Sequence, residues 1–383
     1  MVFFGTYDTH RPRFRILTRG LAQAGVTVSQ CHASIWGDLE DRSHMRDARN
    51  YLRPALRWCA AMPRLARAYA AIPPHDAVIV PYLGQADAVA ARRLVRKRGA
   101  PLIFDPYVSL FETVIGDRKL APSRSLAAHA IRLLDVRAFK AADLVVVDTA
   151  SHGDLIADQL RLGSWRRHVI PVGAEADVFV SRPLPAGRST TSVLFYGSMI
   201  PLHGIETIVR AAAGLRDRGS VRFTVIGTGQ EHAKARALAA QLNAGSIIEW
   251  RDRVPYDLLP SVIAEADICL GIFGTTRKAH AVVPNKVYQA LAVGRPVVSA
   301  DTPAMREWFT PGVDCLLTRP GDHHQLGEAI VSLIEDRALR ERLAHDGHRL
   351  FAEKFSEAAI GEAARAMLTA SSPLRCAGLA GGR

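Results

Sequence analysis

The chain of 383 residues is poor in cysteine and has no long apolar run. Its five cysteines, Cys31, Cys59, Cys269, Cys315 and Cys376, lie far apart, and no Cys-x-x-Cys pair indicates zinc or redox chemistry. Apolar runs such as Leu144–Val147 fall far short of the ~18 residues that span a bilayer. Met1 leads almost at once into Val2–Gly5, which is typical of a first strand and not of a signal peptide. We therefore expect a cytoplasmic protein with reduced thiols and no metal site.

Lysine is scarce relative to arginine. The chain has 42 arginines and 7 lysines, and its formal net charge is +12 at pH 7. Residues 1–187 carry 26 basic against 17 acidic residues, so most of the excess lies in the first half. Such a field favours an anionic partner, namely a membrane surface, a phosphorylated acceptor or a nucleic acid. Nucleic acid is the least expected of the three, because no basic stretch is interleaved with stacking aromatic residues.

Apolar residues make up 48% of the chain, and together with its length this indicates two domains with separate cores. Short β-branched runs alternate with helical patterns in the first half, and the alternation restarts at Ser192. Strands are expected at Val2–Phe4, Val26–Cys31, Ala77–Pro81, Pro101–Phe104, Leu144–Val147 and His168–Pro171, then at Ser192–Tyr196, Arg222–Ile226, Ser246–Trp250, Ile268–Gly271, Pro296–Ala300 and Asp314–Leu317. Strands without polar alternation, each followed by a helix, predict an α/β fold of two Rossmann-like doubly wound domains.

A break rich in proline and glycine at Arg182–Gly187 is typical of a linker between these domains. We place the first domain at residues 1–173, the linker at 174–190 and the second domain at 191–355. A C-terminal helix at 356–369 is expected to pack back toward the first domain, followed by a disordered tail at 370–383. Ligands of such domains bind in the cleft at the carboxyl ends of the strands.

Loops after the first two strands of the second domain contain glycines suited to a phosphate site. Gly197 ends one strand, and a helix begins near His203 and Gly204, where free N–H groups and the helix dipole attract phosphate. Gly227 and Gly229 follow the next strand, although the third glycine of a dinucleotide fingerprint is missing. Alone, each loop is more typical of an ordinary turn.

The segment around Lys286 is the most informative. Pro284 suits the first turn of a helix, and Gly294 ends that helix. Asn285 and Lys286 lie at its N-terminal end, and Gln289 shares a face with Lys286. From this position Lys286 can hold a diphosphate and Gln289 can reach a sugar hydroxyl, although a surface lysine and a capping asparagine fit the segment equally.

Together and in this order, these segments resemble the nucleotide-sugar-binding domain of glycosyltransferase family 4, which consists of retaining enzymes of the GT-B fold. The matching segments are Tyr196-Gly197 with His203-Gly204, Gly227-Thr228-Gly229, Trp250 with Val254-Pro255, Ala266-Asp267-Ile268 and Ala290–Val298. The first half is similar more loosely, through Gly5-Thr6, Gly20-Leu21 with Gly25-Val26, Ala142–Val146 and Val169–Gly173. The resemblance covers residues 1–365 approximately. It implies a GT-B fold whose second domain binds a nucleotide-sugar donor and whose first domain binds the acceptor.

The chain departs from this family at several polar positions. Many members carry Glu-x7-Glu before the Ala-x-Gly-x-Pro-Val-Val run, whereas Ala281 and Gln289 occupy these positions here. The family's basic residues for the donor diphosphate correspond to Ser198 and His203. Gln289 can still bind a ribose hydroxyl, and Lys286 could supply the missing positive charge.

The resemblance implies a set of donor contacts. We expect the donor to contact Gly197, Ser198, Gly204, Gly227, Gly229, Arg251, Pro284, Asn285 and Gln289. Lys286, His203 and the Gly204 amide would stabilise the leaving nucleoside diphosphate as the glycosidic bond breaks. Retention would follow from front-side attack, with the departing phosphate helping to accept the proton. No protein nucleophile, metal or separate cofactor is implied.

Candidate acceptor contacts follow strands of the first domain. Asp105 ends one predicted strand, and Asp148 and His152 follow another. Asp105 or His152 could take the acceptor proton, and Asp148 could bind acceptor hydroxyls, although helix capping also explains Asp148. Gly5 and Thr6 end the first strand, where the backbone could approach a sugar or phosphate or simply turn.

Arginines recur at helical spacing within Ser43–Tyr69, at positions 46, 49, 53, 57, 64 and 67. Basic amphipathic helices lie on anionic membranes or hold anionic acceptors, and a solvated arginine face is the commoner alternative. Pro54 and Pro63 are expected to interrupt or start helices in this segment. We therefore include peripheral contact with the inner membrane face among the expectations.

The sequence thus predicts a retaining, metal-independent glycosyltransferase acting on a sugar, lipid-linked or small-molecule acceptor. The alternative from another class is a non-catalytic nucleotide-sugar-binding protein that lost Glu-x7-Glu and kept the fold. A nucleotide-sugar 2-epimerase shares the architecture but needs catalytic carboxylates that the sequence does not reveal. A nicotinamide dehydrogenase is less expected, because no complete Gly-x-Gly-x-x-Gly follows the first strand.

Overall fold

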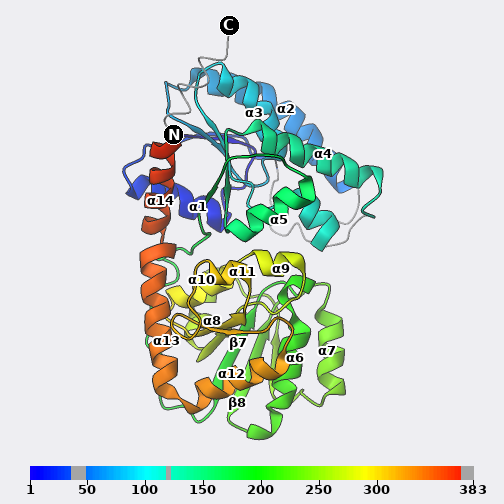
Figure 1. Cartoon of the computed structure of the whole chain (residues 1–383), viewed down its shortest axis with the longest axis vertical. Coiled ribbons are helices and arrows are strands. Elements are labelled where there is room, and N and C mark those ends of the chain that lie inside the picture. The colour runs from blue at the N-terminus through cyan, green and yellow to red at the C-terminus, as the bar shows by residue number, and fades with distance from the viewer. Residues whose placement is uncertain (36–48, 118–121, 372–383) are drawn as a thin grey trace. The chain divides into compact units, whose positions relative to one another are not determined.

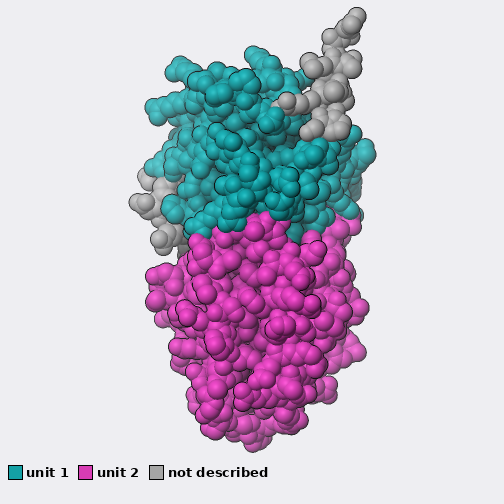
Figure 2. Space-filling view, turned by 90° about the vertical axis from the view of Figure 1, so that its left-hand side faces the viewer, with its two compact units in different colours: residues 1–148, 156–171, 360–383 teal, residues 149–155, 172–359 magenta. Residues whose placement is uncertain are grey.

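The computed structural model describes residues 1–35, 49–117 and 122–371, so Arg46 of the arginine-rich segment lies outside the described residues. The chain forms two compact units (Figure 2). Unit 1 consists of Met1–Asp148, Ile156–Pro171 and the residues from Ile360 onward. Unit 2 consists of Thr149–Leu155 and Val172–Ala359. The segment predicted as a linker is therefore counted with unit 2 from Val172 onward, and the C-terminal helix lies mostly in unit 1.

Unit 1 contains a parallel six-stranded sheet. Its strands are β1 (Val2–Gly5), β2 (Ser29–His32), β3 (Val78–Val80), β4 (Leu102–Phe104), β5 (Leu144–Val147) and β6 (Arg167–Val169), in the spatial order β2-β1-β3-β4-β5-β6. Val78 and Val80 pack into one hydrophobic cluster, and Ile79 between them packs into another on the opposite face. Both faces are buried, which explains why these strands have no polar alternation.

Helices cover both faces of this sheet (Figure 1). α1 (Pro12–Gln23) and α14 (Glu357–Ser371) cover one face, where Ile360, Ala364 and Met367 of α14 join the core. α2 (Arg49–Ala71), α3 (Gln85–Arg96), α4 (Leu126–Ala141) and α5 (Ala150–Leu160) cover the other face. A short π-helix spans Glu112–Asp117. Two helix-covered faces are the construction expected of a doubly wound domain.

α2 corrects the prediction that proline divides this segment. The helix runs without a break from Arg49 to Ala71, through both Pro54 and Pro63. Each proline removes one backbone N–H donor from the helix. The buried side chains of Leu65 and Tyr69 hold the second half of α2 on the sheet. Tertiary packing therefore outweighs the local cost of Pro63.

Unit 2 contains a second parallel six-stranded sheet. Its strands are β7 (Thr191–Tyr196), β8 (Val221–Ile226), β9 (Ile248–Arg251), β10 (Ile268–Leu270), β11 (Val297–Ala300) and β12 (Leu316–Thr318), in the order β12-β11-β10-β7-β8-β9. Its helices are α6 (Ile205–Gly214), α7 (His232–Gln241), α8 (Leu259–Ala264), α9 (Arg277–Ala281), α10 (Asn285–Ala292), α11 (Pro303–Arg306), α12 (His323–Glu335) and α13 (Arg337–Leu350), and a π-helix spans Phe351–Phe355. The prediction of two Rossmann-like doubly wound domains is confirmed. Within the described ranges, every helix is too short or too polar to cross a bilayer.

Candidate functional site

The loops that follow β7 and β8 leave the sheet side by side. The strand register pairs Tyr196 with Ile226, and the Gly197 N–H donates to the Ile226 carbonyl at 3.0 Å. β10 borders β7 on its other side, so the strand order reverses between these two strands. Open α/β sheets bind ligands in the crevice at such a reversal. The candidate site therefore lies at the carboxyl end of β7 in unit 2.

Lys286 has a buried ammonium group without a partner. It lies in the first turn of α10 and is 6% exposed. Its Nζ atom is 4.0 Å from the centroid of the Phe195 ring and has no hydrogen-bond or ion-pair partner among the described residues. Burial lowers the pKa of Lys286 well below its usual value, because the charged form loses its water. Buried charges are normally paired, so an anionic ligand reaching this atom would stabilise its charged form.

His203 lies beside Lys286. It ends the 3-10 turn Pro201–His203, is buried, and packs its ring against Phe195 at 5.8 Å between centroids. Its Nδ1 atom has no hydrogen-bond partner in the described part of the chain. Burial lowers the pKa of His203 well below its usual value, the Lys286 charge lowers it further, and a hydrogen bond with the Ser198 backbone opposes both effects. The imidazole is therefore neutral at pH 7, and its Nδ1 atom can donate or accept one hydrogen bond with a ligand.

Gly197 brings these two polar groups together. A methyl group at this position would lie 3.1 Å from Lys286 Nζ and 3.3 Å from His203 Cε1. The φ angle of Gly197 is +140°, a conformation that other residues rarely adopt. We call Gly197, His203 and Lys286 the Lys286 cradle. Ser198, the next residue, is exposed beside it.

Gly227 and Gly229 permit close contact between two backbone loops. A methyl group at Gly227 would lie 2.3 Å from the Gly197 carbonyl oxygen, and one at Gly229 would lie 2.6 Å from the Met199 nitrogen. The Met199 N–H donates to the Thr228 carbonyl at 2.9 Å, which joins the loops directly. Gly227 and Gly229 therefore allow the loop after β8 to pack against Gly197 and Met199. Their contact with a donor stays a prediction.

Gly204 links the turn to α6. Its Cβ, if present, would lie 2.4 Å from the backbone carbon of Phe273, so the residue is needed for close packing. Its amide already donates to the Pro201 carbonyl at 3.2 Å. A contact between the Gly204 amide and a leaving group stays a prediction. The positive end of the α6 dipole still points toward this turn.

Gln289 is held by Tyr196, a residue of the matching segments to which the sequence analysis gave no role. Tyr196 donates its hydroxyl to Gln289 Oε1 at 3.0 Å and lies 3.2 Å from the Lys286 carbonyl. Tyr196 therefore fixes the first turns of α10 against β7. The amide oxygen of Gln289 is used by this contact, and a ribose contact for Gln289 stays a prediction.

The remaining predicted donor contacts are Pro284, Asn285 and Arg251. Pro284 caps α10 and Asn285 begins it. Arg251 ends β9, is exposed, and forms an ion pair with Glu249 at 2.9 Å. Its charge is therefore partly compensated within the protein.

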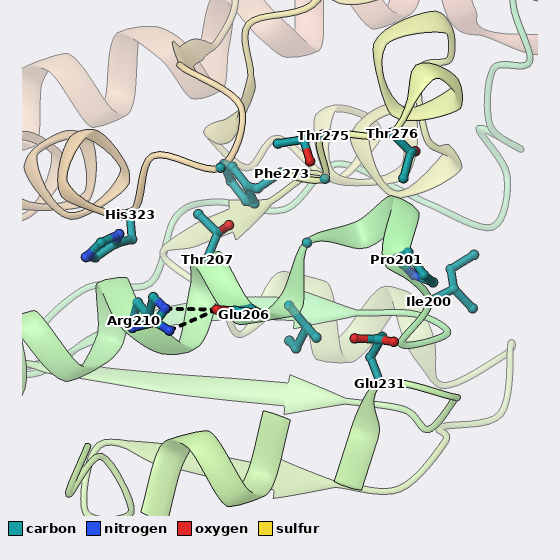
Figure 3. Close-up of a pocket in the computed structure, with 14 residues that line it drawn as sticks. Ile200, Pro201, Glu206, Thr207, Arg210, Glu231, Phe273, Thr275, Thr276 and His323 are labelled. Atoms are coloured by element: carbon teal, nitrogen blue, oxygen red, sulfur yellow. Dashed lines mark hydrogen bonds and ion pairs between the residues drawn. The ribbon is translucent and has the colours of Figure 1, made fainter. Parts of the chain in front are cut away.

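A pocket of about 420 Å³ opens next to the turn before α6 (Figure 3). Its walls come from α6, from the loop 273–276 after β10, from Gly321, and from His323 at the start of α12. Glu206 and Arg210 form an ion pair of 2.9 Å along one wall. Gly204 lines the pocket, whereas Lys286 and His203 do not. The turn 201–204 thus contributes Pro201 and Gly204 to the pocket and His203 to the Lys286 cradle. The pocket is therefore not the space beside Lys286.

Gly5 and Thr6 in unit 1 are engaged in a structural network. The carboxylate of Asp87 accepts hydrogen bonds from the Thr6 amide at 2.7 Å and from the Thr6 hydroxyl at 3.0 Å. A methyl group at Gly5 would lie 2.5 Å from the same carboxylate oxygen. Trp58 donates to the other oxygen at 2.6 Å. Asp87, which the pattern did not single out, therefore anchors the loop after β1.

Asp105 forms a buried ion pair with Arg13. The Arg13 Nε atom lies 2.8 and 2.9 Å from the two carboxylate oxygens. Arg13 Nη1 also donates to the carbonyls of Ile170 and Pro171, each at 3.3 Å. Burial raises the pKa of Asp105, and Arg13 opposes this rise. Arg13 therefore connects Asp105, which follows β4, to the chain after β6. The predicted role of Asp105 as a proton acceptor gains no support from this geometry.

The start of α5 contains the other candidates. Asp148 and His152 are buried. The His152 N–H donates to the Thr149 hydroxyl at 3.0 Å, which is the capping arrangement considered for this turn. Acceptor contacts by these residues stay predictions.

Comparison with known proteins bears on the second unit most directly. Residues 190–336, which lie within unit 2, match the family model of glycosyl transferases group 1. The lipopolysaccharide core biosynthesis glycosyltransferase LpsE of Rhizobium meliloti is 27% identical over 233 residues, which cover 59% of this chain and 64% of LpsE. Alpha-D-kanosaminyltransferase of Streptomyces kanamyceticus is 24% identical over 280 residues, which cover 69% of each chain. The chain thus spans about two thirds of these curated relatives.

Solved structures show the fold of the whole chain. Sucrose-phosphate synthase from Thermosynechococcus elongatus superposes with a TM-score of 0.69 at 17% identity, covering 97% of this chain and 99% of that one. Anabaena Alr3699/HepE in complex with UDP-glucose gives a TM-score of 0.67 at 16% identity, with 96% and 99% covered. The chain has the two-domain α/β architecture of GT-B glycosyltransferases.

Proposed function

We propose that this chain is a glycosyltransferase that transfers a sugar from a nucleotide-sugar donor to an acceptor hydroxyl with retention of configuration. The fold, the family match of unit 2 and the Lys286 cradle support this proposal. The cradle carries it, because an unpaired ammonium at the carboxyl end of β7 is a property of this chain itself. Where the chain has Ala281 and Gln289 in place of Glu-x7-Glu, Lys286 would supply the positive charge for the donor diphosphate.

The cradle would act on the leaving group. In our proposal the donor diphosphate lies over Gly197, where it favours the protonated form of Lys286 and accepts its hydrogen bonds. His203 supplies a second, neutral hydrogen-bonding group beside it. The Phe195 ring beneath Nζ favours a cation at this position. Negative charge that develops as the glycosidic bond breaks is thereby stabilised in a buried setting, where electrostatic effects are strong.

The acceptor proton needs no protein base in this scheme. Front-side attack would let the departing phosphate help to accept the proton, which leaves Asp105 free for its ion pair with Arg13. A direct part for His152 in proton transfer, and acceptor contacts by Asp148, Gly5 and Thr6, stay secondary proposals. Metal independence, a cytoplasmic location and peripheral membrane contact are also proposals from the sequence.

Two alternatives have no observation in their favour. A non-catalytic binder would use the cradle to hold a nucleotide sugar without turnover. A 2-epimerase would release a free sugar in the absence of an acceptor. The names of the similar curated proteins describe transferases.

Nucleoside diphosphate release tests the proposal. The purified chain is incubated with a panel of nucleotide sugars in EDTA, with and without simple sugar acceptors, beginning with UDP-glucose because HepE was solved with it. We expect acceptor-dependent release of the diphosphate, lowered ~100-fold or more in Lys286→Ala. The matched control is Lys354→Ala, which removes an exposed lysine of unit 2. Saturable donor binding without release would contradict catalysis, and acceptor-independent sugar release would favour the epimerase.

A further inference from the structure

The outer helices of unit 1 present cations that have no counter-charge. α3 contacts both α2 and α4, and the three helices lie on the same face of the sheet (Figure 1). Seven exposed cationic side chains on them lack a hydrogen-bond or ion-pair partner among the described residues, namely Arg64, Arg67, Arg93, Arg96, Lys97, Arg137 and Lys140. We call this surface the cationic layer.

Acidic side chains on the same helices are turned inward. α2 has no aspartate or glutamate in its sequence, and α3 and α4 have one each, Asp87 and Asp135. Both are buried, at 1% and 0% exposure. Asp87 accepts from Thr6 and Trp58, and Asp135 accepts from the Ser109 hydroxyl at 2.8 Å. The described part of these helices therefore offers solvent a surface of one sign.

Large aliphatic side chains lie among the cations. Leu126 is 90% exposed and Leu133 is 48% exposed on α4. Their spacing of seven residues, followed by Arg137 and Lys140, puts all four on one stripe of the helix. On α2, Leu56 is 62% exposed and lies two turns before Arg64. Single exposed leucines are ordinary, whereas leucines aligned with unpaired cations on adjacent helices form an amphipathic surface.

We propose that the cationic layer docks onto an anionic phospholipid bilayer. The arginines and lysines would bind lipid phosphates, and the exposed leucines would enter the boundary between headgroups and acyl chains. Charge complementarity requires an anionic occupant. The exposed large hydrophobic residues of the described chain are aliphatic, whereas a nucleic acid surface would use aromatic stacking.

This surface has a consequence for the proposed transferase. A bilayer-bound chain would meet acceptors that are themselves held in the membrane, such as lipid-linked sugars. That consequence rests on the proposed function, whereas bilayer binding itself does not involve the Lys286 cradle. Vesicle binding by Lys286→Ala therefore separates the two proposals, because we expect it to equal that of the wild type.

Co-sedimentation with vesicles tests the docking. The whole chain is mixed with phosphatidylcholine vesicles that contain no anionic lipid or roughly one third phosphatidylglycerol, at low and moderate salt. The variant is Arg64→Gln/Arg67→Gln on α2, because neither residue lies in the last turn of its helix, where cations also stabilise the helix dipole. The control is Arg218→Gln/Arg337→Gln, which removes two exposed cations of unit 2 and equally changes the net charge.

We expect binding to anionic vesicles that weakens with salt, and a loss of roughly fivefold for each arginine removed from α2. The control should stay within about twofold of the wild type. Leu126→Ser/Leu133→Ser on α4 should also weaken binding severalfold. Equal binding to neutral vesicles, an equal loss in the control, or tighter binding to a polynucleotide at the same phosphate concentration would overturn the proposal.

Discussion

The two units share one construction and treat buried charge differently. In unit 1, the buried carboxylates of Asp87, Asp105 and Asp135 are all hydrogen-bonded within the protein. In unit 2, the buried ammonium of Lys286 has no partner in the described chain. Charges that are paired inside a unit serve its fold. A buried charge whose partner is absent from the protein indicates a ligand of opposite sign.

At the surface the contrast is reversed. Exposed arginines of unit 2 commonly pair with acids, as in Arg218–Glu335, Arg251–Glu249, Arg306–Asp301 and Arg337–Glu341. Those of the cationic layer in unit 1 have no such partners among the described residues. The same rule therefore applies at two scales. In our proposals, the unpaired charge of unit 2 binds a small anion, and the unpaired charges of unit 1 bind an anionic surface.

Removing the acid of the buried pair in unit 1 should have the largest effect on stability. Asp105→Ala leaves the Arg13 guanidinium buried without its partner, so the free energy of unfolding should fall by about 3–5 kcal/mol. Urea unfolding measures the loss. The control is Asp301→Ala in unit 2, which breaks an exposed pair and should cost a small fraction of that amount. If Asp105→Ala kept the wild-type free energy of unfolding and lost turnover, Asp105 would instead be the proton acceptor.

Removing the buried cation of unit 2 should have the opposite effect on stability. Lys286→Met replaces an unpaired ammonium with an apolar side chain of similar length, so the free energy of unfolding should stay equal or rise. Affinity for the donor nucleotide should nevertheless fall ~100-fold, because the diphosphate loses its charged partner. Unfolding curves with and without nucleotide report both quantities. Lower stability without ligand would show that Lys286 is paired inside the protein.

Closing the cradle should have a smaller effect. Gly197→Ala puts a methyl group against Lys286 and His203 at a φ of +140°, which should cost about 1–3 kcal/mol in stability and also weaken nucleotide binding. Gly245→Ala, at a glycine with nothing within 4 Å of an added methyl, is the control. Unchanged binding in Gly197→Ala would place the anion elsewhere in unit 2.

The smallest effect is a dependence on pH. The pKa of Lys286 is lower in the folded chain than in the unfolded one. Between that lowered pKa and the usual value near 10.5, the unfolded chain binds more protons, so stability rises with pH. Relative to Lys286→Met, the rise should be at most about 1.4 kcal/mol per pH unit. Nucleotide affinity should fall over the same range. Parallel pH profiles for the two proteins would contradict the unpaired lysine.

Much of this organisation could be predicted from local sequence. The β-branched runs indicate the strands because both sheet faces are buried, and Gly197 and Lys286 could be placed at the ends of their elements. The position of Lys286 at a helix start predicts a phosphate ligand, and this role stays a prediction. The burial of Lys286 could not be predicted, because Phe195 and His203 come close to it only in the folded chain.

The long-range partners could not be predicted from spacing. Arg13 and Asp105 are 92 residues apart, and Tyr196 and Gln289 are 93 residues apart. From the sequence alone, a proton acceptor and an ion-pair partner are equally reasonable roles for Asp105. The continuity of α2 through Pro63 could not be predicted for a related reason, because packing of Leu65 and Tyr69 on the sheet compensates the local cost of the proline.

Titration calorimetry with nucleoside diphosphates is the most direct test of the Lys286 cradle. UDP, GDP, ADP and dTDP are titrated in EDTA into the wild type, Lys286→Met and Lys354→Ala, in buffers of different ionisation enthalpy. The account predicts that one diphosphate binds the wild type and Lys354→Ala equally and binds Lys286→Met ~100-fold more weakly. At a pH above the lowered pKa of Lys286, binding to the wild type should also take up protons, and binding to Lys286→Met should lack that uptake. Equal affinity and equal proton uptake in Lys286→Met would contradict it.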